Sequence, residues 1–169
     1  MINLINEKKV SFDEVIKSLN KQKSDTSWAE KTNDFAINYA QHLTEVYGDV
    51  WYSGFLPLEY FLNILLPKHV HHISNENTDD ILQFPEDTTV KDATNLIKSP
   101  KSIYANDCLK SIDYLKEKIL ETGFISNIVL VVIDGKIKHV DGLHRMIALA
   151  LLFEDGYKYK PIEVFLCRG

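Results

Sequence analysis

Apolar and polar residues follow their clearest pattern in the last third of the chain, where they predict a β-hairpin. Residues Ile128–Ile133 form an unbroken apolar run, rich in β-branched side chains and of a length suited to a buried strand. Asp134-Gly135 follows, the pair favoured by a type I′ turn because both central positions take positive φ. Lysine and apolar residues then alternate up to Val140, as in a half-buried return strand.

The hairpin leads into an apolar block that predicts a buried helix. Residues Met146–Phe153 are good helix formers and include no charged side chain, so we expect this helix to be covered nearly all round. Gly142 precedes it and permits a backbone conformation closed to other residues. We therefore expect the chain to turn from strand to helix at this glycine.

Two further segments complete the predicted sheet and its cover. Residues Asn106–Thr122 form an amphipathic helix that stops at Gly123. Its apolar face consists of Cys108, Ile112, Leu115 and Ile119. Residues Pro161–Leu166 alternate enough apolar positions to form a last strand. Together these elements predict an α+β fold, in which helices flank a mixed sheet.

Start signals predict two helices in the N-terminal region. Ser11-x-x-Glu14 and Ser27-x-x-Glu30 are both capping-box patterns ahead of apolar periodicity. The second helix stops near Gly48. Its predicted packing face consists of Trp28, Phe35, Tyr39, His42, Leu43 and Val46. We expect His42 to pack there without a chemical role, and residues 1–48 to form a helical extension to a domain over residues 49–169.

The middle of the chain leaves two interpretations open. Residues Trp51–Leu66 are dense in apolar groups, and Pro57 could open a helix over residues 58–66. The alternative is a strand over residues 54–58. Asn75–Asp92 is polar and acidic and predicts a long loop, of the kind that often forms a lid or a partner surface.

Three closely spaced histidines, His69, His71 and His72, raise the question of a metal site. Imidazole is the commonest ligand of transition metals, and alternate residues of a strand share a face. No nearby cysteine or HExxH pattern accompanies them, and solvated surface histidines are the more usual occurrence. We therefore assign these residues no metal.

Composition and charge restrict the class of protein. A chain of 169 residues with 45% hydrophobic content can build the core of one compact domain. Its net charge of −5 argues against broad nucleic-acid binding, since phosphate backbones reward a basic face. The sequence shows neither a secretion leader nor an apolar run of about 18 residues. We expect a cytoplasmic protein without membrane association, in which Cys108 and Cys167 are reduced thiols.

The turn from strand to buried helix carries the most specific chemistry. The first N–H groups of a helix lack internal partners and hold a partial positive charge, so they bind anions. His144 and Arg145 add side-chain donors, and an arginine guanidinium can bind phosphate through two parallel hydrogen bonds. Asp141 would repel a phosphate unless Mg²⁺ bridges the two or the carboxylate acts as a base on a bound hydroxyl. In the alternative interpretation Asp141 only caps the helix and Gly142 only eases the turn.

The segments Glu121-Thr122-Gly123-Phe124 and Val140-Asp141-Gly142-Leu143-His144-Arg145, with the hairpin between them, resemble the ParB/sulfiredoxin superfamily. The resemblance covers about the last third of the chain. It implies that the helix N-terminus holds nucleotide phosphates, through Gly142, Leu143, His144, Arg145 and Met146. Members of the superfamily include chromosome-partition CTPases, sulfiredoxins and free-serine kinases, so the fold alone does not fix the reaction.

Departures from the family patterns favour one branch. Leu143 stands where a sulfiredoxin carries its reactive cysteine. Partition proteins usually show Gly-Glu-Arg-Arg and continue into a helix-turn-helix domain, which we do not expect here. The turn is most similar to the Asp-Gly-His-His-Arg of the serine kinases. Glu59 lies in the region of those kinases' catalytic glutamate, but an exposed carboxylate in a helix's first turn is the favoured alternative.

The sequence thus predicts a kinase that uses ATP or ADP with Mg²⁺ to phosphorylate a small, serine-like hydroxyl compound. Asp141, His144, Arg145 and Glu59 are the candidate catalytic residues, and Asp141 is the candidate metal ligand. The rival hypothesis is a non-catalytic switch that binds CTP or ATP and forms a homodimer, or docks a partner, through its N-terminal helices. A third is an interaction domain that has lost nucleotide binding.

Overall fold

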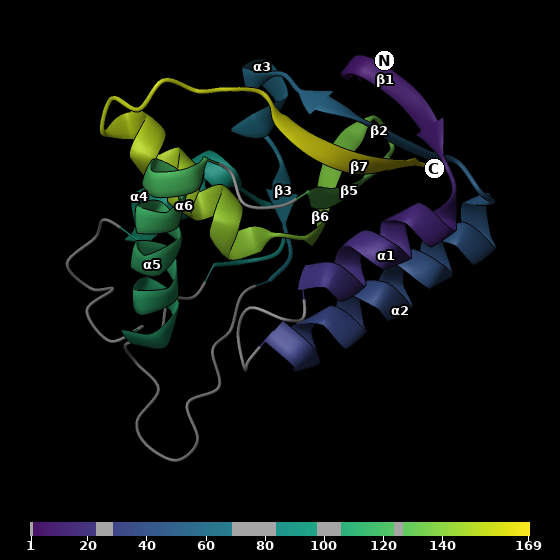
Figure 1. Ribbon diagram of the computed structural model, residues 1–169, viewed down its shortest axis with the longest axis horizontal. Helices are drawn as coiled ribbons and strands as arrows, with labels where there is room; N and C mark the ends of the chain where they lie inside the picture. The colour runs from purple at the N-terminus through teal and green to yellow at the C-terminus, as the bar shows by residue number, and fades with distance from the viewer. Residues whose placement is uncertain (1, 23–28, 69–83, 98–105, 124–126) are drawn as a thin grey trace. The chain divides into compact units, whose positions relative to one another are not determined.

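The computed structural model describes residues 2–22, 29–68, 84–97, 106–123 and 127–169 (Figure 1). The chain forms two compact units, each built from segments that are distant in sequence. The first unit comprises Met1–Pro57, Ser126–Gly142 and Pro161–Gly169. The second comprises Leu58–Ile125 and Leu143–Lys160.

The first unit contains five strands of a mixed sheet. Its strands are β1 (Ile5–Val10), β2 (Trp51–Leu56), β5 (Ile128–Ile133), β6 (Lys136–Asp141) and β7 (Ile162–Arg168). They lie in the order β1-β2-β7-β5-β6. β5 and β7 are parallel, and the other neighbours are antiparallel. The predicted α+β class with a mixed sheet is confirmed.

The β5–β6 hairpin forms as predicted. Asp134 and Gly135 have φ of 51° and 74°, the two positive values that a type I′ turn requires. A bulge interrupts the register near the end of β6, because Leu130 pairs with His139 while Val129 pairs with Asp141. Val140 is the additional residue, and the strand runs one position beyond the predicted end, to Asp141.

Two helices, α1 (Phe12–Gln22) and α2 (Ala29–Tyr47), belong to the same unit. The predicted capping box opens α1: the Ser11 N–H donates to the Glu14 carboxylate at 2.9 Å, and the Glu14 N–H donates to the Ser11 hydroxyl at 3.4 Å. Gly48 (φ 84°) ends α2 as predicted, with its N–H donating to the Thr44 carbonyl at 2.9 Å. The second predicted capping box includes Ser27, which lies outside the described residues.

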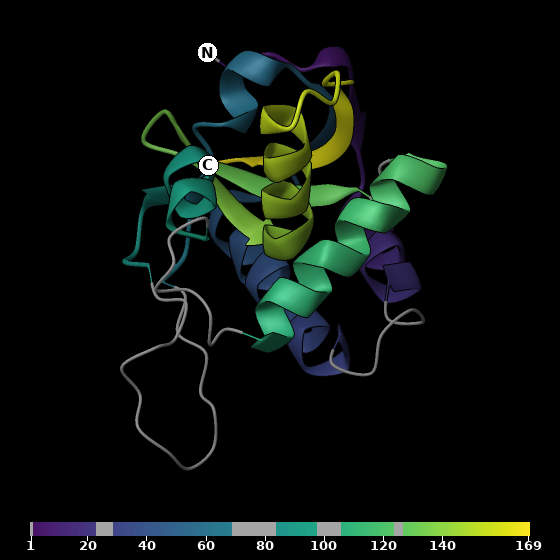
Figure 2. The ribbon, with the colours of Figure 1, turned by 90° about the vertical axis from the view of Figure 1, so that its left-hand side faces the viewer.

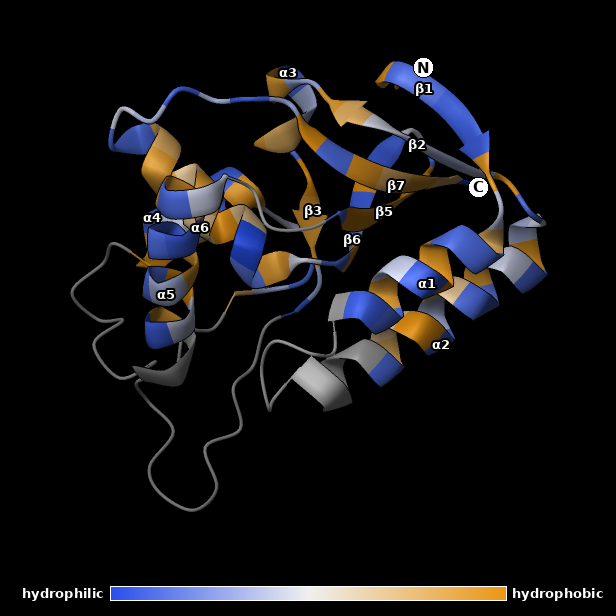
Figure 3. Cartoon of the chain, viewed as in Figure 1, coloured by the Kyte–Doolittle hydropathy of each residue, from blue (hydrophilic) through white to orange (hydrophobic). Residues whose placement is uncertain are grey.

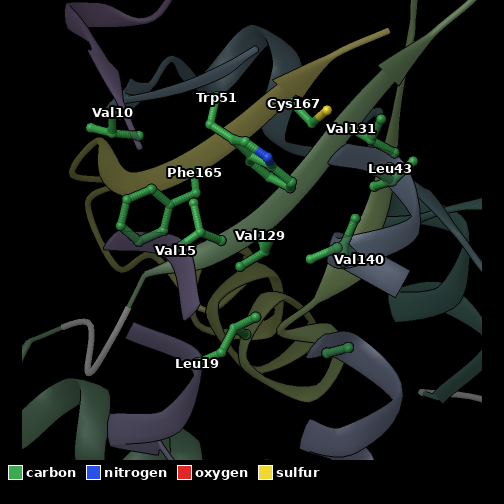
Figure 4. Packing of buried hydrophobic residues seen from close by; sticks show 12 residues of the cluster. Val10, Val15, Leu19, Leu43, Trp51, Val129, Val131, Val140, Phe165 and Cys167 are labelled. Carbon is green, nitrogen blue, oxygen red and sulfur yellow. The ribbon is translucent and has the colours of Figure 1, made fainter. Parts of the chain in front are cut away.

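The core of this unit joins α1 and α2 to one face of the sheet (Figure 4). Trp51 of β2 is fully buried in this core. The other members are Val10, Val15, Leu19, Ala36, Ala40, Leu43, Val129, Val131, Val140, Phe165 and Cys167. Cys167 is a free thiol, as predicted, and burial raises its pKa to about 11. Residues from five separate stretches of chain therefore form one packed layer.

The packing face of α2 agrees with the prediction only in part. Leu43 is buried and Tyr39 packs against the core, as predicted, whereas Phe35 is 71% exposed and Val46 55% exposed. Ala36 and Ala40 are the other buried residues of the helix. His42 is exposed and does not pack in the core, so that expectation was wrong. Alanine side chains are small and allow a helix to pack closely against a sheet. α2 therefore turns its alanines toward the sheet and leaves larger side chains on the neighbouring face exposed.

β1 is a further difference, because the sequence predicted only helices in the N-terminal region. The strand reads INEKKV and is mostly exposed at the edge of the sheet, so its apolar periodicity is weak. β1 pairs with β2, and the chain comes close to β2 at Gly54, where an added Cβ would lie 2.8 Å from the Cβ of Leu4. A glycine at this position permits the close approach.

The second unit consists mainly of helices. Its elements are α3 (Leu58–Phe61), β3 (Leu65–Leu66), β4 (Thr88–Thr89), α4 (Val90–Ile97), α5 (Asn106–Thr122) and α6 (Leu143–Glu154). α4 and α5 both pack against α6 (Figure 2). Every residue from Met146 to Leu152 is buried, as the apolar block predicted. α5 has its predicted bounds and buries Ile112 and Ile119, while the side chain of Cys108 lies outside the description.

Two predictions for the middle of the chain need correction. The apolar segment contains both a strand and a helix: the strand covers Trp51–Leu56, and the helix begins at Leu58 as predicted but ends already at Phe61. The predicted loop up to Asp92 ends earlier, because α4 begins at Val90. Its start signal is a second capping pattern, in which the Asp92 N–H donates to the Thr89 hydroxyl at 3.1 Å.

Hydropathy follows these elements (Figure 3). α6 is largely hydrophobic, while α1 and α5 carry polar residues along their lengths. None of the helices in the described ranges is both long enough and apolar enough to cross a membrane.

Candidate functional site

The candidate site is the turn that joins β6 to α6. β6 ends at Asp141, Gly142 has φ of 106°, and α6 begins at Leu143. Side chains other than hydrogen rarely tolerate this φ, so glycine allows the strand to end and the helix to begin within one residue. The predicted order of strand, glycine and helix is confirmed.

Gly142 occupies the position at which a side chain usually caps a helix, and it has none to offer. In a helix that begins at Leu143, the N–H groups of residues 142–145 have no helical acceptor. Asp141 precedes this group as the last strand residue and is 8% exposed. The side chain of Met146 is fully buried, so this residue belongs to the core of its unit.

The charges in the first turn of α6 differ from those of other helices in the protein. α1, α3 and α4 each carry an acidic residue in the first turn, namely Asp13 with Glu14, Glu59, and Asp92. α6 has no acidic residue there, and its second and third residues are His144 and Arg145. Because the start of a helix carries partial positive charge, a cation in this turn is disfavoured and an anion is favoured.

Leu143, His144 and Arg145 are each partly exposed. Asp141, His144 and Arg145 also take part in interactions within the chain. A bound anion would therefore join or replace existing contacts of these residues. The turn offers backbone N–H groups, an imidazole and a guanidinium, which is a donor set suited to phosphate oxygens.

Glu59 does not join this group. It is exposed on α3, which is connected to the last turn of α6 through Tyr159. The ring centroid of Tyr159 lies 5.4 Å from that of Phe61 and 6.5 Å from that of Phe153. Phe153 lies about 12 Å from Arg145 along the axis of α6, so the contact with α3 is at the opposite end of α6 from the turn. The structure thus gives Glu59 the surroundings of an exposed carboxylate in a helix's first turn.

Asp141 is the one predicted metal ligand that the structure describes. Mg²⁺ that arrives with a nucleotide needs only one or two protein carboxylates, because phosphates and water complete its shell. A single carboxylate fits that kind of ion. His69, His71 and His72 lie outside the described residues, and within the described ranges no three His, Cys, Asp or Glu side chains gather as a metal site.

His139 is a further titratable residue near the turn, which the sequence pattern did not single out. It lies on β6 two residues before Asp141, and its Nε2 atom is buried. The signal in the sequence was the alternation of polar and apolar residues in Lys-Ile-Lys-His-Val-Asp, which we interpreted only as a strand.

Comparison with protein-family models identifies one family, whose function is unknown. No curated protein and no solved structure matches the chain. A family model, described as a family of unknown function (DUF6309), matches residues 4–166. Because this match covers nearly the whole chain, the protein belongs to the DUF6309 family.

Proposed function

We propose that this protein binds a nucleotide at the β6–α6 turn and transfers a phosphoryl group to a small metabolite that bears a hydroxyl group. One observation carries the proposal: a glycine with φ of 106° opens a helix whose first turn holds His144 and Arg145 and no acidic residue. A cation at a helix start is disfavoured by roughly 0.3–1 kcal/mol, and a bound anion offsets that cost.

In this proposal, the N–H groups of residues 142–145 and the first turn of α6 hold the phosphates of ATP or ADP. Arg145 grips two phosphate oxygens, and His144 donates to a third. Both side chains stabilise the negative charge of the phosphoryl group during transfer. The resemblance of the turn to the serine kinases suggests a serine-like acceptor.

Asp141 has two candidate roles. As a base, its carboxylate takes the proton of the acceptor hydroxyl while the hydroxyl oxygen bonds to the terminal phosphorus. The bond from that phosphorus to the bridging oxygen breaks, and the nucleotide leaves one phosphate shorter. As a ligand, the same carboxylate would bind Mg²⁺, which neutralises phosphate charge.

The low exposure of Asp141, at 8%, favours a second candidate function. A base must reach the hydroxyl that it deprotonates, and a largely covered carboxylate does so less readily. A nucleotide-binding switch without catalysis needs only the phosphate-binding turn. It would bind CTP or ATP and respond by binding a second copy or another protein. In either case we propose that the protein acts in the cytoplasm, because nucleotides are abundant there.

Calorimetry with ATP, ADP and CTP, each with Mg²⁺, tests binding first. A mass-spectrometric assay with serine and other small hydroxyl compounds then tests transfer. For the kinase we expect a phosphorylated product that Asp141→Asn abolishes, while Asp113→Asn on the exposed side of α5 leaves it unchanged. Binding without product would support the switch, and absence of binding by all three nucleotides would contradict both functions.

A further inference from the structure

The bulge in β6 decides on which side of the sheet Asp141 lies. Residues two apart in a regular strand share a side, so in a regular β6 Asp141 would lie on the side of His139. The register differs, because His139 pairs with Leu130 and Asp141 pairs with Val129. Directly paired residues share a side, and neighbouring residues of β5 point to opposite sides. The additional residue therefore moves Asp141 to the side opposite His139.

The side that Asp141 gains is the one that faces α1 and α2. Val129 belongs to the core cluster that joins these helices to the sheet (Figure 4). Val140, the additional residue of the bulge, belongs to the same cluster and is 4% exposed. β6 and α2 are also in contact. Val140 is thus an apolar anchor between the regular part of β6 and the turn.

The bulge sets a carboxylate in a largely covered position, since Asp141 is 8% exposed. Such burial costs free energy unless the carboxylate finds partners, and Asp141 does take part in interactions within the chain. Bulges are frequent beside active sites, where they redirect a side chain. A bulge directly before Gly142 therefore gives this carboxylate one defined place next to the turn.

We infer that Val140 is a positioning residue for the phosphate-binding turn. The inference rests on the proposed function, in which Asp141 and the N–H of Gly142 act on the nucleotide. The packing of Val140 in the core holds the bulge, and the bulge fixes the direction of the two residues that follow it. Without this anchor the register of β6 can shift by one residue, which returns Asp141 to the side of His139.

Val131 provides the matched control. It is a fully buried valine of the same core cluster, on the neighbouring strand β5. It pairs with Lys138, in the regular part of the hairpin. Replacing either valine with alanine removes the same two carbon atoms from the same core. A difference in nucleotide binding between the two variants therefore reports the position of Val140 beside the turn, and not the loss of core packing.

Calorimetry with ATP and Mg²⁺ tests the positioning role, and urea denaturation of the same variants measures their stability. We expect Val140→Ala to bind ATP roughly tenfold more weakly than the wild type, because a small displacement of positioned groups is costly. Val131→Ala should lose similar stability and keep the wild-type affinity. Val140→Ile keeps a branched apolar anchor and should also bind ATP as the wild type does.

The outcomes separate this inference from the proposed function. Equal weakening in Val140→Ala and Val131→Ala, or wild-type affinity in Val140→Ala, would overturn the positioning role and leave the proposed function standing. Wild-type protein that binds no nucleotide would overturn both. If Val140→Ala does not fold, Val140→Thr is compared with Val131→Thr in the same way, because threonine keeps the branched shape of the side chain.

Discussion

The indole Nε1 of Trp51 donates a hydrogen bond to the hydroxyl of Thr44 at 2.9 Å, which joins the buried end of β2 to helix α2. The Thr44 hydroxyl in turn donates to the carbonyl of Ala40 at 3.0 Å. The Trp51 ring also stacks against Phe12 of α1, with centroids 6.2 Å apart. One fully buried tryptophan thus connects the sheet to both helices of its unit.

Replacing Thr44 with valine should destabilise the protein, because it leaves the buried indole N–H without its acceptor. We expect a loss of roughly 1–3 kcal/mol in the free energy of unfolding. Thr44→Ser is the matched control, since it keeps the hydroxyl and should retain most of the stability. Urea denaturation measures both variants. Equal stability of Thr44→Val and the wild type would show that the hydrogen bond contributes nothing.

Gly54→Ala should also destabilise the protein, for a steric reason. The added Cβ would lie 2.8 Å from the Cβ of Leu4 and 3.0 Å from the carbonyl oxygen of Ile5, so β1 must shift away from β2. We expect a loss of about 1–3 kcal/mol in thermal or urea unfolding. An alanine variant as stable as the wild type would mean that the segment around Leu4 and Ile5 does not lie this close to Gly54.

The capping box of α1 predicts a pH dependence. The hydrogen bond from the Ser11 N–H holds the pKa of Glu14 below its ordinary value of 4.5. A carboxylate with a lowered pKa stabilises the folded state above that ordinary value, and this contribution is lost as the pH falls through the pKa of the folded state. We therefore expect Glu14→Gln to be less stable than the wild type at neutral pH, and the difference to shrink as the solution is acidified.

Urea denaturation of both proteins at a series of pH values measures this difference. Glu86→Gln is the control for net charge, because it also replaces an exposed carboxylate with a neutral amide. A difference between Glu14→Gln and the wild type that stays constant down to acidic pH would show that the charge of Glu14 does not stabilise the cap.

Local signals in the sequence predicted much of the fold correctly. Asp134-Gly135 defines the hairpin because few other pairs accept two positive φ values, and Gly123 marks the end of α5 with φ of 83°. The turn at Gly142 was predictable for the same reason. In each case a short segment fixes its own conformation.

Contacts between distant segments were not predictable in this way. β7 lies between β2 and β5, an order that depends on pairing residues more than a hundred positions apart. β1 was missed because an edge strand needs little apolar periodicity. The packing face of α2 was predicted correctly at Leu43 but wrongly at Phe35 and Val46, because the packing of Ala36 and Ala40 on the sheet depends on shape and not on hydrophobicity. In the candidate site, the turn was predicted correctly. The place of Glu59, on α3 and away from the turn, depends on contacts between distant segments and was not predictable.

The central claim, that the start of α6 binds phosphate, is tested most directly by calorimetry of ATP binding to Arg145→Ala. Lys91→Ala is the matched control, because it removes a cation from the first turn of α4. We predict that Arg145→Ala weakens ATP binding at least tenfold, consistent with the loss of a charge-assisted hydrogen bond of about 1.5–3 kcal/mol, while Lys91→Ala binds as the wild type does. Wild-type protein that binds no nucleotide, or Arg145→Ala with unchanged affinity, would contradict the claim.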